Sequence, residues 1–521
     1  MRKKSIILAI SVIYLLLTIG FVSPLRGGIP TFQELMDPNF CPNAQFGMKI
    51  ENSSIDDNSL KVETTGSVLQ INFNESSFQF AQKIGKVRNI LKVEFSVDIS
   101  KPIITHSKSG MVFVKFEESG FDFRANGDSL FMIHAKKPLT ISLKPDFIPV
   151  FDGNYQSNHL LLDEYGGFGV YCSIIDLPDK YNKLSETIAV YDLPEDSVLW
   201  ISICPPKKYD WQKSINDNVL WHWSTVTSYP DDETIKSWIP YGNTVLFQGE
   251  IMLWKDWNLG FEPRLGIKEW NRVKNTLHQN KMRYMVYTSP YYYLLGTEFK
   301  NEAVNSFDNF KGWPTNKPTH GENVDLFIEA ITKVMKELKP DGLYFDGTYR
   351  DNIAAQYKLA RHTRNIVGEN GLLEWHSTLA FGKTKVKDLC YLPQVDSYAD
   401  YILRGEHLKT DFNDLNYLRY YVSGYNASNS IGVFCTRDHS FITEKFCQIL
   451  FDNNIRLHLA TGKENLRIKK YSGWVYQQEV LKKYHDLYLS KLSPGLQYRV
   501  EKLCDKRQEE YEKSTVASKN N

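Results

Sequence analysis

The alternation of strand-like and helix-like segments after about residue 216 is the feature that most restricts the fold. Short apolar runs such as residues 342–346 are each followed by a longer stretch, and in residues 322–338 the apolar side chains recur every three or four positions. That spacing predicts an amphipathic helix packed on a strand. About six or seven such units in roughly 250 residues predict a (β/α)8 barrel rather than a doubly wound sheet.

The preceding half of the chain has a different rhythm. From about residue 45 to 215, short runs rich in Val, Ile, Phe and Tyr are separated by Gly, Asn, Asp and Pro. At least seven such runs without a helical pattern predict an antiparallel β-sandwich. The expected domains are therefore a sandwich over residues 40–215, a barrel over residues 216–495 and a charged, disordered tail over residues 505–521.

The amino terminus predicts export. Arg2, Lys3 and Lys4 precede an uncharged apolar run over residues 5–22, which is typical of a signal peptide or a signal-anchor helix within residues 1–25. Either form sends the rest of the chain out of the cytoplasm, secreted or held by a single membrane span. Three Asn-x-Ser sequons agree with export, at Asn52, Asn74 and Asn426.

Charge and cysteine content exclude several classes of protein. The net charge is +1, from 62 basic and 61 acidic residues, so no basic surplus attracts nucleic acid. The seven cysteines show no CxxC spacing, so zinc ribbons and redox motifs are not indicated. No GxGxxG follows the first strands, and no cofactor is expected.

Acidic residues follow almost every predicted strand of the barrel. Since the carboxyl ends of barrel strands meet at one mouth, these side chains are expected to converge there. One such acid is ordinary turn chemistry, but several around one rim indicate a site. The candidates are Glu250, Asp346, Glu374, Asp396, Asp400, Glu406 and Asp438.

Paired carboxylates at one mouth are the groups that cleave glycosidic bonds, one staying ionised and the other donating a proton. Aromatic rings nearby would stack on sugar faces, and further polar groups would bind hydroxyls. The stacking candidates are Trp254, Tyr349 and Trp375. The hydroxyl-binding candidates are Glu250, Arg350, His376 and Asp396. A carbohydrate substrate is therefore expected.

Two motifs carry a resemblance to a known group. "DGLYFDG" (341–347) followed by "VDSYADYILRGEH" (395–407) resembles the α-galactosidase-like and N-acetylgalactosaminidase-like glycoside hydrolases, which have an N-terminal β-sandwich and a (β/α)8 barrel. The resemblance implies that Asp346 is the nucleophile or electrostatic stabiliser and Glu406 the general acid/base. Glu374 is the rival acid, because an apolar strand beside Trp375 favours its protonated form.

The chain departs from that pattern. Tyr344 stands where the α-galactosidases have a strand lysine. Two other classes therefore stay open. One is a non-catalytic, membrane-tethered carbohydrate-binding protein on a degenerate barrel, in which Asp346→Asn would change nothing. The other is a metal-dependent hydrolase, which would need two or three histidines at strand ends, whereas only His376 clearly lies at one.

Overall fold

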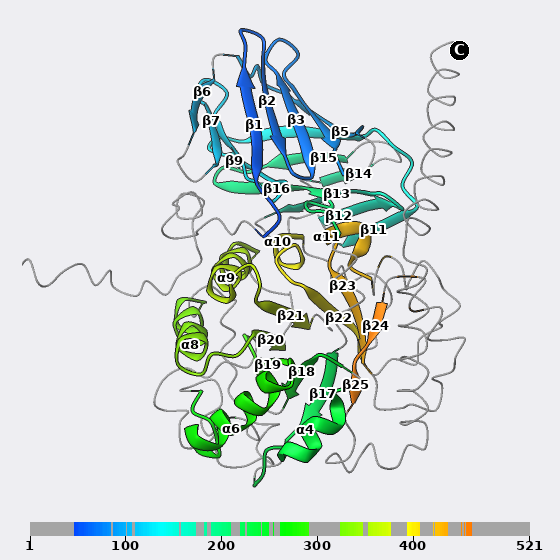
Figure 1. The fold of residues 1–521 in the computed structure, drawn as a ribbon. Coiled ribbons are helices and arrows are strands. Elements are labelled where there is room, and N and C mark those ends of the chain that lie inside the picture. Colours follow the sequence, from blue (N-terminus) through cyan, green and yellow to red (C-terminus); the bar gives the residue numbers. More distant parts are fainter. Residues whose placement is uncertain are drawn as a thin grey trace, which may run out of the picture.

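In the computed structural model the described strands form three sheets, and the two antiparallel ones lie together at one end of the parallel one (Figure 1). The residues it describes are 46–84, 87–100, 102–106, 110–155, 158–172, 182–184, 189–209, 219–224, 227–240, 242–248, 254, 261–290, 324–346, 353–376, 393–406, 420, 423–435, 450, 453 and 455–460. Two antiparallel sheets occupy the amino-terminal half, and one parallel sheet follows them.

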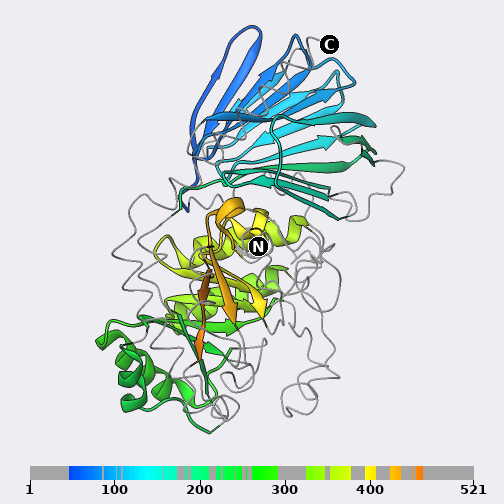
Figure 2. The same cartoon turned by 90° about the vertical axis from the view of Figure 1, so that its right-hand side faces the viewer.

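The two antiparallel sheets lie face to face (Figure 2). The first has the order β1 (Ile50–Ile55), β2 (Ser59–Thr64), β3 (Ser67–Asn72), β4 (Ser77–Gln82), β5 (Arg88–Phe95), β10 (Leu139–Pro145), β15 (Ala189–Leu193) and β14 (Asn182–Leu184). The second has the order β11 (Phe151–Tyr155), β12 (Asn158–Asp163), β13 (Gly166–Cys172), β16 (Ser197–Cys204), β9 (Leu130–Ala135), β8 (Phe121–Ala125), β7 (Val112–Phe116) and β6 (Ile103–His106). Alternate residues of the central strands are buried, as in β2 and β3, and these fill a core between the sheets.

One strand-like run of the sequence forms two strands in the structure. The run at residues 59–74 splits into β2 and β3, which form a hairpin through Thr65 and Gly66. A Cβ on Gly66 would lie 2.6 Å from the carbonyl oxygen of Pro205, so the turn packs too closely for any other residue. The apolar pattern continues through this turn and hides it.

The third sheet is parallel throughout and closes on itself. Its strands run in the order β24 (Ile455–Leu457), β23 (Ile431–Cys435), β22 (Tyr401–Glu406), β21 (Leu372–His376), β20 (Gly342–Asp346), β19 (Arg283–Thr288), β18 (Thr244–Gln248), β17 (Val219–Trp223) and β25 (Leu459–Ala460). Only His458 separates β24 from β25, yet β24 pairs with β23 and β25 pairs with β17. The segment 455–460 therefore joins the two ends of the sheet by hydrogen bonds.

Helices lie between the parallel strands along the chain. They are α4 (Asp232–Trp238), α6 (Gly266–Gln279), α8 (Val324–Glu337), α9 (Ile353–Val367), α10 (Pro393–Asp396) and α11 (Tyr425–Ser428). Because strand side chains alternate between the two faces, Phe345 of β20 points away from Asp346 and packs on Phe327 of α8, 5.4 Å between ring centroids. The outward residues of the strands thus form the core under the helices.

A buried polar network attaches the second antiparallel sheet to the helices. Asn126 Nδ2 donates to the hydroxyl of Tyr357 on α9 at 2.7 Å. The hydroxyls of Tyr357 and Tyr398 both donate to Asp128 Oδ2, at 2.7 and 2.5 Å. Each of these side chains is at most 6% exposed. Since buried polar groups are costly when unpaired, this network fixes how the two halves meet.

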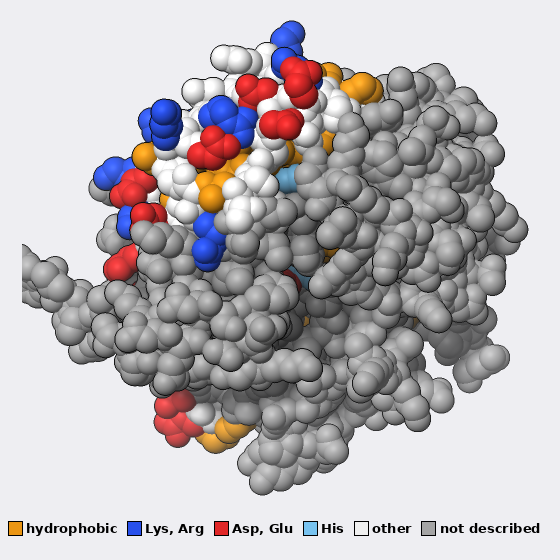
Figure 3. All heavy atoms as spheres, turned by 90° about the horizontal axis from the view of Figure 1, so that it is seen from below, with side chains coloured by type: hydrophobic (Ala, Val, Ile, Leu, Met, Phe, Trp, Pro, Cys, Tyr) orange, Lys and Arg blue, Asp and Glu red, His pale blue; other side chains and the backbone are white. Residues whose placement is uncertain are grey.

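No helix among the described residues is long and apolar enough to cross a membrane, and the apolar run at residues 5–22 lies outside them. Where described side chains reach the surface in the view from below, basic and acidic groups are interspersed (Figure 3). That mixture agrees with the net charge of +1.

Candidate active site

Asp346 and His376 lie side by side where two neighbouring parallel strands end. They are register partners, Asp346 as the last residue of β20 and His376 as the last residue of β21. Tyr344 and Glu374, two residues earlier, are also partners and share the same face of the sheet. The strands therefore present Asp346 and His376 at their carboxyl ends, with Tyr344 and Glu374 one layer below.

Each carboxylate oxygen of Asp346 is held by a different side chain. The hydroxyl of Tyr287, from β19, donates to Oδ2 at 2.5 Å, and Nδ1 of His376 lies 2.8 Å from Oδ1. The Ser289 hydroxyl donates to the backbone oxygen of Asp346. The carboxylate is nevertheless 23% exposed. Two donors from opposite sides orient it, and further lone pairs stay available for a ligand.

The tautomer of His376 follows from these contacts. Its Nδ1 lies 2.8 Å from Asp346 Oδ1 and 2.7 Å from the hydroxyl oxygen of Tyr344. Without a proton on Nδ1, two lone pairs would face each other across the contact with Asp346. Protonation at Nδ1 avoids this, because the N–H can then donate to the carboxylate. Tyr344 supports the ring from below, with centroids 6.0 Å apart.

Glu374 lies beneath this site and does not reach its surface. Its side chain is 0% exposed, and Oε1 lies 3.0 Å from Nε2 of His458, itself 1% exposed. The alignment of this close contact falls short of a hydrogen bond. A general acid must touch the leaving oxygen of its substrate. The buried position therefore argues against direct proton donation by Glu374, and it makes Glu374 and His458 a pair inside the closed sheet.

Both described tryptophans among the predicted residues are core residues. Trp375 is 1% exposed and packs on Phe345 at 4.9 Å, on the helix-facing side of the sheet. Trp254 is 0% exposed, stacks on Trp270 of α6 at 5.4 Å, and donates from Nε1 to the Tyr287 carbonyl. The expectation that these rings stack on sugar is wrong for this arrangement, because neither ring face is open.

Asp396 and Asp400 lie at the other end of the strands. β22 begins only at Tyr401, so both residues precede the strand instead of following it. Asp396 is 0% exposed in α10, and Asp400 Oδ2 accepts from Arg364 Nη1 at 2.9 Å and from the backbone N–H of Leu373 at 2.8 Å. The prediction that Asp396 binds a sugar hydroxyl is therefore corrected: both acids lie buried at the amino ends of the strands, away from Asp346.

The other predicted residues are only partly placed. Glu406 is the last residue of β22, two strands from Asp346, and its side chain is outside the described part of the structure. Asp438 also lies outside the described residues, as do Glu250, Tyr349 and Arg350. Their roles stay predictions.

Tyr287, Ser289, Tyr344 and His458 belong to this site but were not predicted from the sequence. Acids at strand ends carried the prediction, whereas the groups that hold Asp346 are hydroxyls and a histidine on the neighbouring strands. A signal was present in "MVYTSP" (285–290), where an apolar run ends in three hydroxyl side chains. Among the described residues no group of three or more His, Cys, Asp or Glu side chains could hold a metal ion.

In comparisons with known proteins, this chain is similar to solved structures only. No family model and no curated protein sequence matches the chain. An uncharacterised protein of Listeria monocytogenes is 10% identical with a TM-score of 0.42, over 89% of this chain and 57% of that one. The cycloalternan-forming enzyme of the same organism is 8% identical with a TM-score of 0.39, over 88% and 56%. A GH31 dextranase of Flavobacterium johnsoniae is 8% identical with a TM-score of 0.38, over 84% and 68%.

These proteins include glycoside hydrolases, but TM-scores below 0.5 assign neither a family nor an activity to this chain. The chain spans little more than half the length of the two Listeria proteins. The more specific resemblance to α-galactosidase-like enzymes stays a prediction.

Proposed function

We propose that the chain is a glycoside hydrolase on a (β/α)8 barrel, with Asp346 as nucleophile or electrostatic stabiliser. The observation that carries the proposal is the partly exposed carboxylate of Asp346 at the carboxyl end of a parallel strand, held from both sides by Tyr287 and His376. Catalytic groups of barrel enzymes sit at this end of the strands. A carboxylate fixed by two donors and open to solvent suits attack on an anomeric carbon.

Glu406 is the proposed general acid/base. Counted from β17, Asp346 ends the fourth strand and Glu406 ends the sixth, so both belong to the same rim. In the proposed reaction Glu406 gives its proton to the departing glycosidic oxygen while Asp346 bonds to, or stabilises charge at, the anomeric carbon. Water then attacks the anomeric carbon, the bond to Asp346 breaks if one has formed, and Glu406 takes a proton from that water.

The alternative of a non-catalytic carbohydrate-binding protein receives less support. That reading requires an open aromatic cleft, and the two described candidates, Trp254 and Trp375, are at most 1% exposed. A binding module also has no need of a carboxylate fixed by two donors beside a buried histidine.

Hydrolysis of a panel of aryl α- and β-glycosides and of neutral oligosaccharides by the full chain tests the proposal. Asp346→Asn is expected to reduce kcat by at least about a thousandfold, since it removes the nucleophile while keeping the shape of the side chain. Asp400→Asn is the matched control for a buried acid at the opposite end of the strands. Equal turnover by Asp346→Asn and the unmodified chain would end the hydrolase proposal.

We also propose that the sheets lie outside the cytoplasm. The support is the basic and apolar order of residues 2–22, together with the exposure of the sequon asparagines Asn52 and Asn74. Protease added to intact cells should then digest the protein. Protection until the cells are lysed would contradict this location.

A further inference from the structure

A large cavity lies between the first antiparallel sheet and the amino ends of the parallel strands. Its volume is about 810 Å³, which is in the range of small-molecule sites. One wall comes from residues 46–49, Glu51 and Thr65, near β1 and β2. The other wall comes from the residues that begin or precede the parallel strands: Arg283, Glu369, Asn370, Ala399, Asp400, Asn429 and Ile431.

This cavity is separate from the candidate active site. Arg283 is the first residue of β19, whereas Asp346 is the last residue of the neighbouring β20. A strand of five residues is about 16 Å long at the usual rise. The two sites are thus on opposite ends of the closed sheet, and the described lining residues do not include Asp346 or His376.

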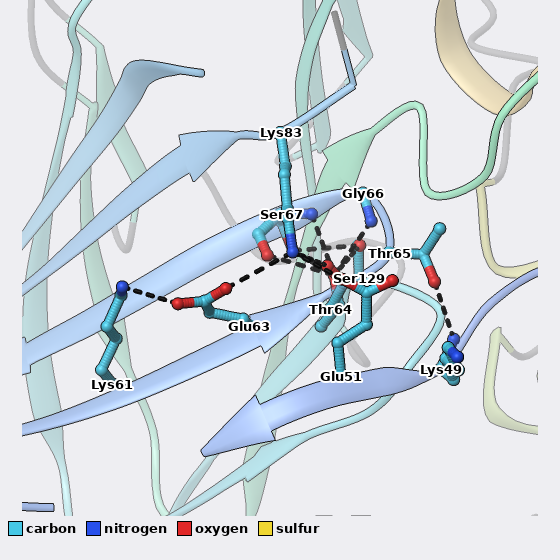
Figure 4. A network of polar contacts seen from close by, with 10 residues as sticks. All are labelled: Lys49, Glu51, Lys61, Glu63, Thr64, Thr65, Gly66, Ser67, Lys83 and Ser129. Atoms are coloured by element: carbon cyan, nitrogen blue, oxygen red, sulfur yellow. Dashed lines mark hydrogen bonds and ion pairs between the residues drawn. The ribbon is translucent and has the colours of Figure 1, made fainter. Parts of the chain in front are cut away.

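The cavity wall carries a surplus of positive charge. Among the described lining residues, four are basic, Lys49, Lys207, Lys208 and Arg283, and three are acidic, Glu51, Glu369 and Asp400. Two of the acids form ion pairs with basic residues that are not among the described lining residues. Lys83 Nζ binds Glu51 at 2.6 Å (Figure 4), and Arg364 binds Asp400 at 2.9 Å. Among the described residues, Glu369 is thus the acid of this wall that faces the bases without an ion-pair partner.

Part of this charge is built into the wall and does not depend on flexible surface side chains. Lys207 is 6% exposed, and its ammonium donates to the carbonyl oxygens of Ser397 at 2.6 Å and Ala399 at 3.3 Å. The ring of Phe46 lies between two cations, 4.4 Å from Lys207 Nζ and 4.1 Å from Arg364 Cζ. Lys49 and Lys208 are exposed at the same cavity.

We propose that this cavity is a second ligand site, which binds an anionic oligosaccharide carrying carboxylate or sulfate groups. Lys49 and Lys208 contact the anionic groups, and fixed positive charge at Lys207 adds to the attraction. Tyr209, half-buried in the wall, offers a ring to the apolar face of a sugar. The inference does not depend on hydrolysis at Asp346.

Calorimetric titration of the full chain with trigalacturonate, a chondroitin sulfate tetrasaccharide and neutral maltotriose tests the site. We expect at least one of the two anionic probes to bind, with an affinity that falls as salt is raised. The double variant Lys49→Ala with Lys208→Ala should weaken this binding by about tenfold or more, and Lys49→Arg with Lys208→Arg should retain it. Lys236→Ala, an exposed lysine on α4, is the control and should bind normally.

The outcomes separate this site from the proposed active site. Asp346→Asn should leave binding of the anionic probe unchanged, whatever it does to hydrolysis. Three results would overturn the inference: neither anionic probe binds, maltotriose binds as tightly as they do, or Asp346→Asn abolishes binding while the lysine pair does not matter. Circular dichroism of each variant checks that the fold is intact.

Discussion

The hydroxyl of Tyr287 shows how the site depends on a residue from a neighbouring strand. Tyr287 lies on β19, and its hydroxyl donates to the carboxylate of Asp346 on β20. The backbone carbonyl of Tyr287 accepts from Nε1 of the buried Trp254. The packing of Trp254 therefore fixes the strand that carries the donor. Trp254 was predicted to touch substrate, and the structure gives it this supporting position instead.

Tyr287→Phe should lower kcat by roughly 10- to 100-fold, because a hydrogen bond to a charged group contributes about 1.5–3 kcal/mol. The Tyr284→Phe variant is the matched control, since this hydroxyl on the same strand faces the carbonyls of Leu338 and Lys339. Steady-state kinetics on any substrate found for the unmodified chain measure both. Similar losses in the two variants would count against a role for Tyr287 at Asp346.

A buried histidine predicts how stability depends on pH. Burial lowers the pKa of His222, which packs against Trp238 and Phe247, to about 3. Since the pKa of an unfolded histidine is about 6.5, the unfolded state binds the extra proton as pH falls between these values. The contribution of His222 to the free energy of unfolding is therefore fully present above about pH 6.5. It is lost as pH falls below that value, by about 1.4 kcal/mol per pH unit.

Denaturant unfolding of His222→Leu at several pH values between 6 and 4 measures this effect. As pH falls, the free energy of unfolding of the variant should decrease less steeply than that of the unmodified chain. The two slopes should differ by about the amount that corresponds to one bound proton. Equal slopes in both proteins would contradict the lowered pKa of His222.

At the scale of elements, the sequence predicted helices better than strand ends. Amphipathic spacing predicted a helix over residues 322–338, and the structure has α8 (324–337) there. When apolar residues keep a helical spacing over four turns, the pattern fits a helix and does not fit a strand. The first parallel strand, β17 ("VLWHW"), was missed because five residues give almost no periodicity.

The candidate site could be predicted where the chemistry and the strand end coincide. Asp346 and His376 each follow an apolar run directly, and the register of β20 and β21 brings them together. The prediction for Asp396 was wrong because nothing in the local sequence shows that the strand starts five residues later, at Tyr401. Asp163 is buried and accepts hydrogen bonds from Arg88 at 2.5 and 2.7 Å, a partner 75 residues away that no local pattern indicates.

β20 also depends on a glycine at its start. A Cβ at Gly342 would lie 2.3 Å from the carbonyl oxygen of Leu372 on the paired strand β21. Gly342→Ala should therefore lower the free energy of unfolding by about 2 kcal/mol or more, because backbone of both strands must shift. Gly368→Ala is the comparison: its added Cβ meets nothing within 4 Å, and only its φ of +76° is strained. Chemical denaturation should show the larger loss at Gly342.

At the scale of the whole molecule, the two halves have unequal cores. One apolar cluster lies wholly within the antiparallel sheets. The other combines the parallel sheet and its helices with Met48, which precedes β1, and with five residues of the second antiparallel sheet: Leu130, Met132, Tyr171, Val198 and Trp200. The parallel sheet thus relies on the antiparallel sheets for part of its core, while the antiparallel sheets contain a complete core of their own.

Separate expression of fragments 46–209 and 216–521 should expose this asymmetry. We expect the first to unfold cooperatively and the second to aggregate or to lack a cooperative transition, because it loses both the apolar cover and the partners of Tyr357 and Tyr398. Calorimetry and size-exclusion chromatography measure both properties. A second fragment that is monomeric and unfolds cooperatively would show that the shared core is dispensable.

The segment 455–460, which bonds both ends of the parallel sheet, has a consequence for how the protein is made. A ribosome releases β17 more than two hundred residues before it releases β25, the strand that must cover it. Throughout that interval the nascent chain carries two unprotected β-edges, the form most prone to join the edges of other chains. Biogenesis of this protein is therefore most vulnerable late in translation, when almost everything except the closing strand has emerged.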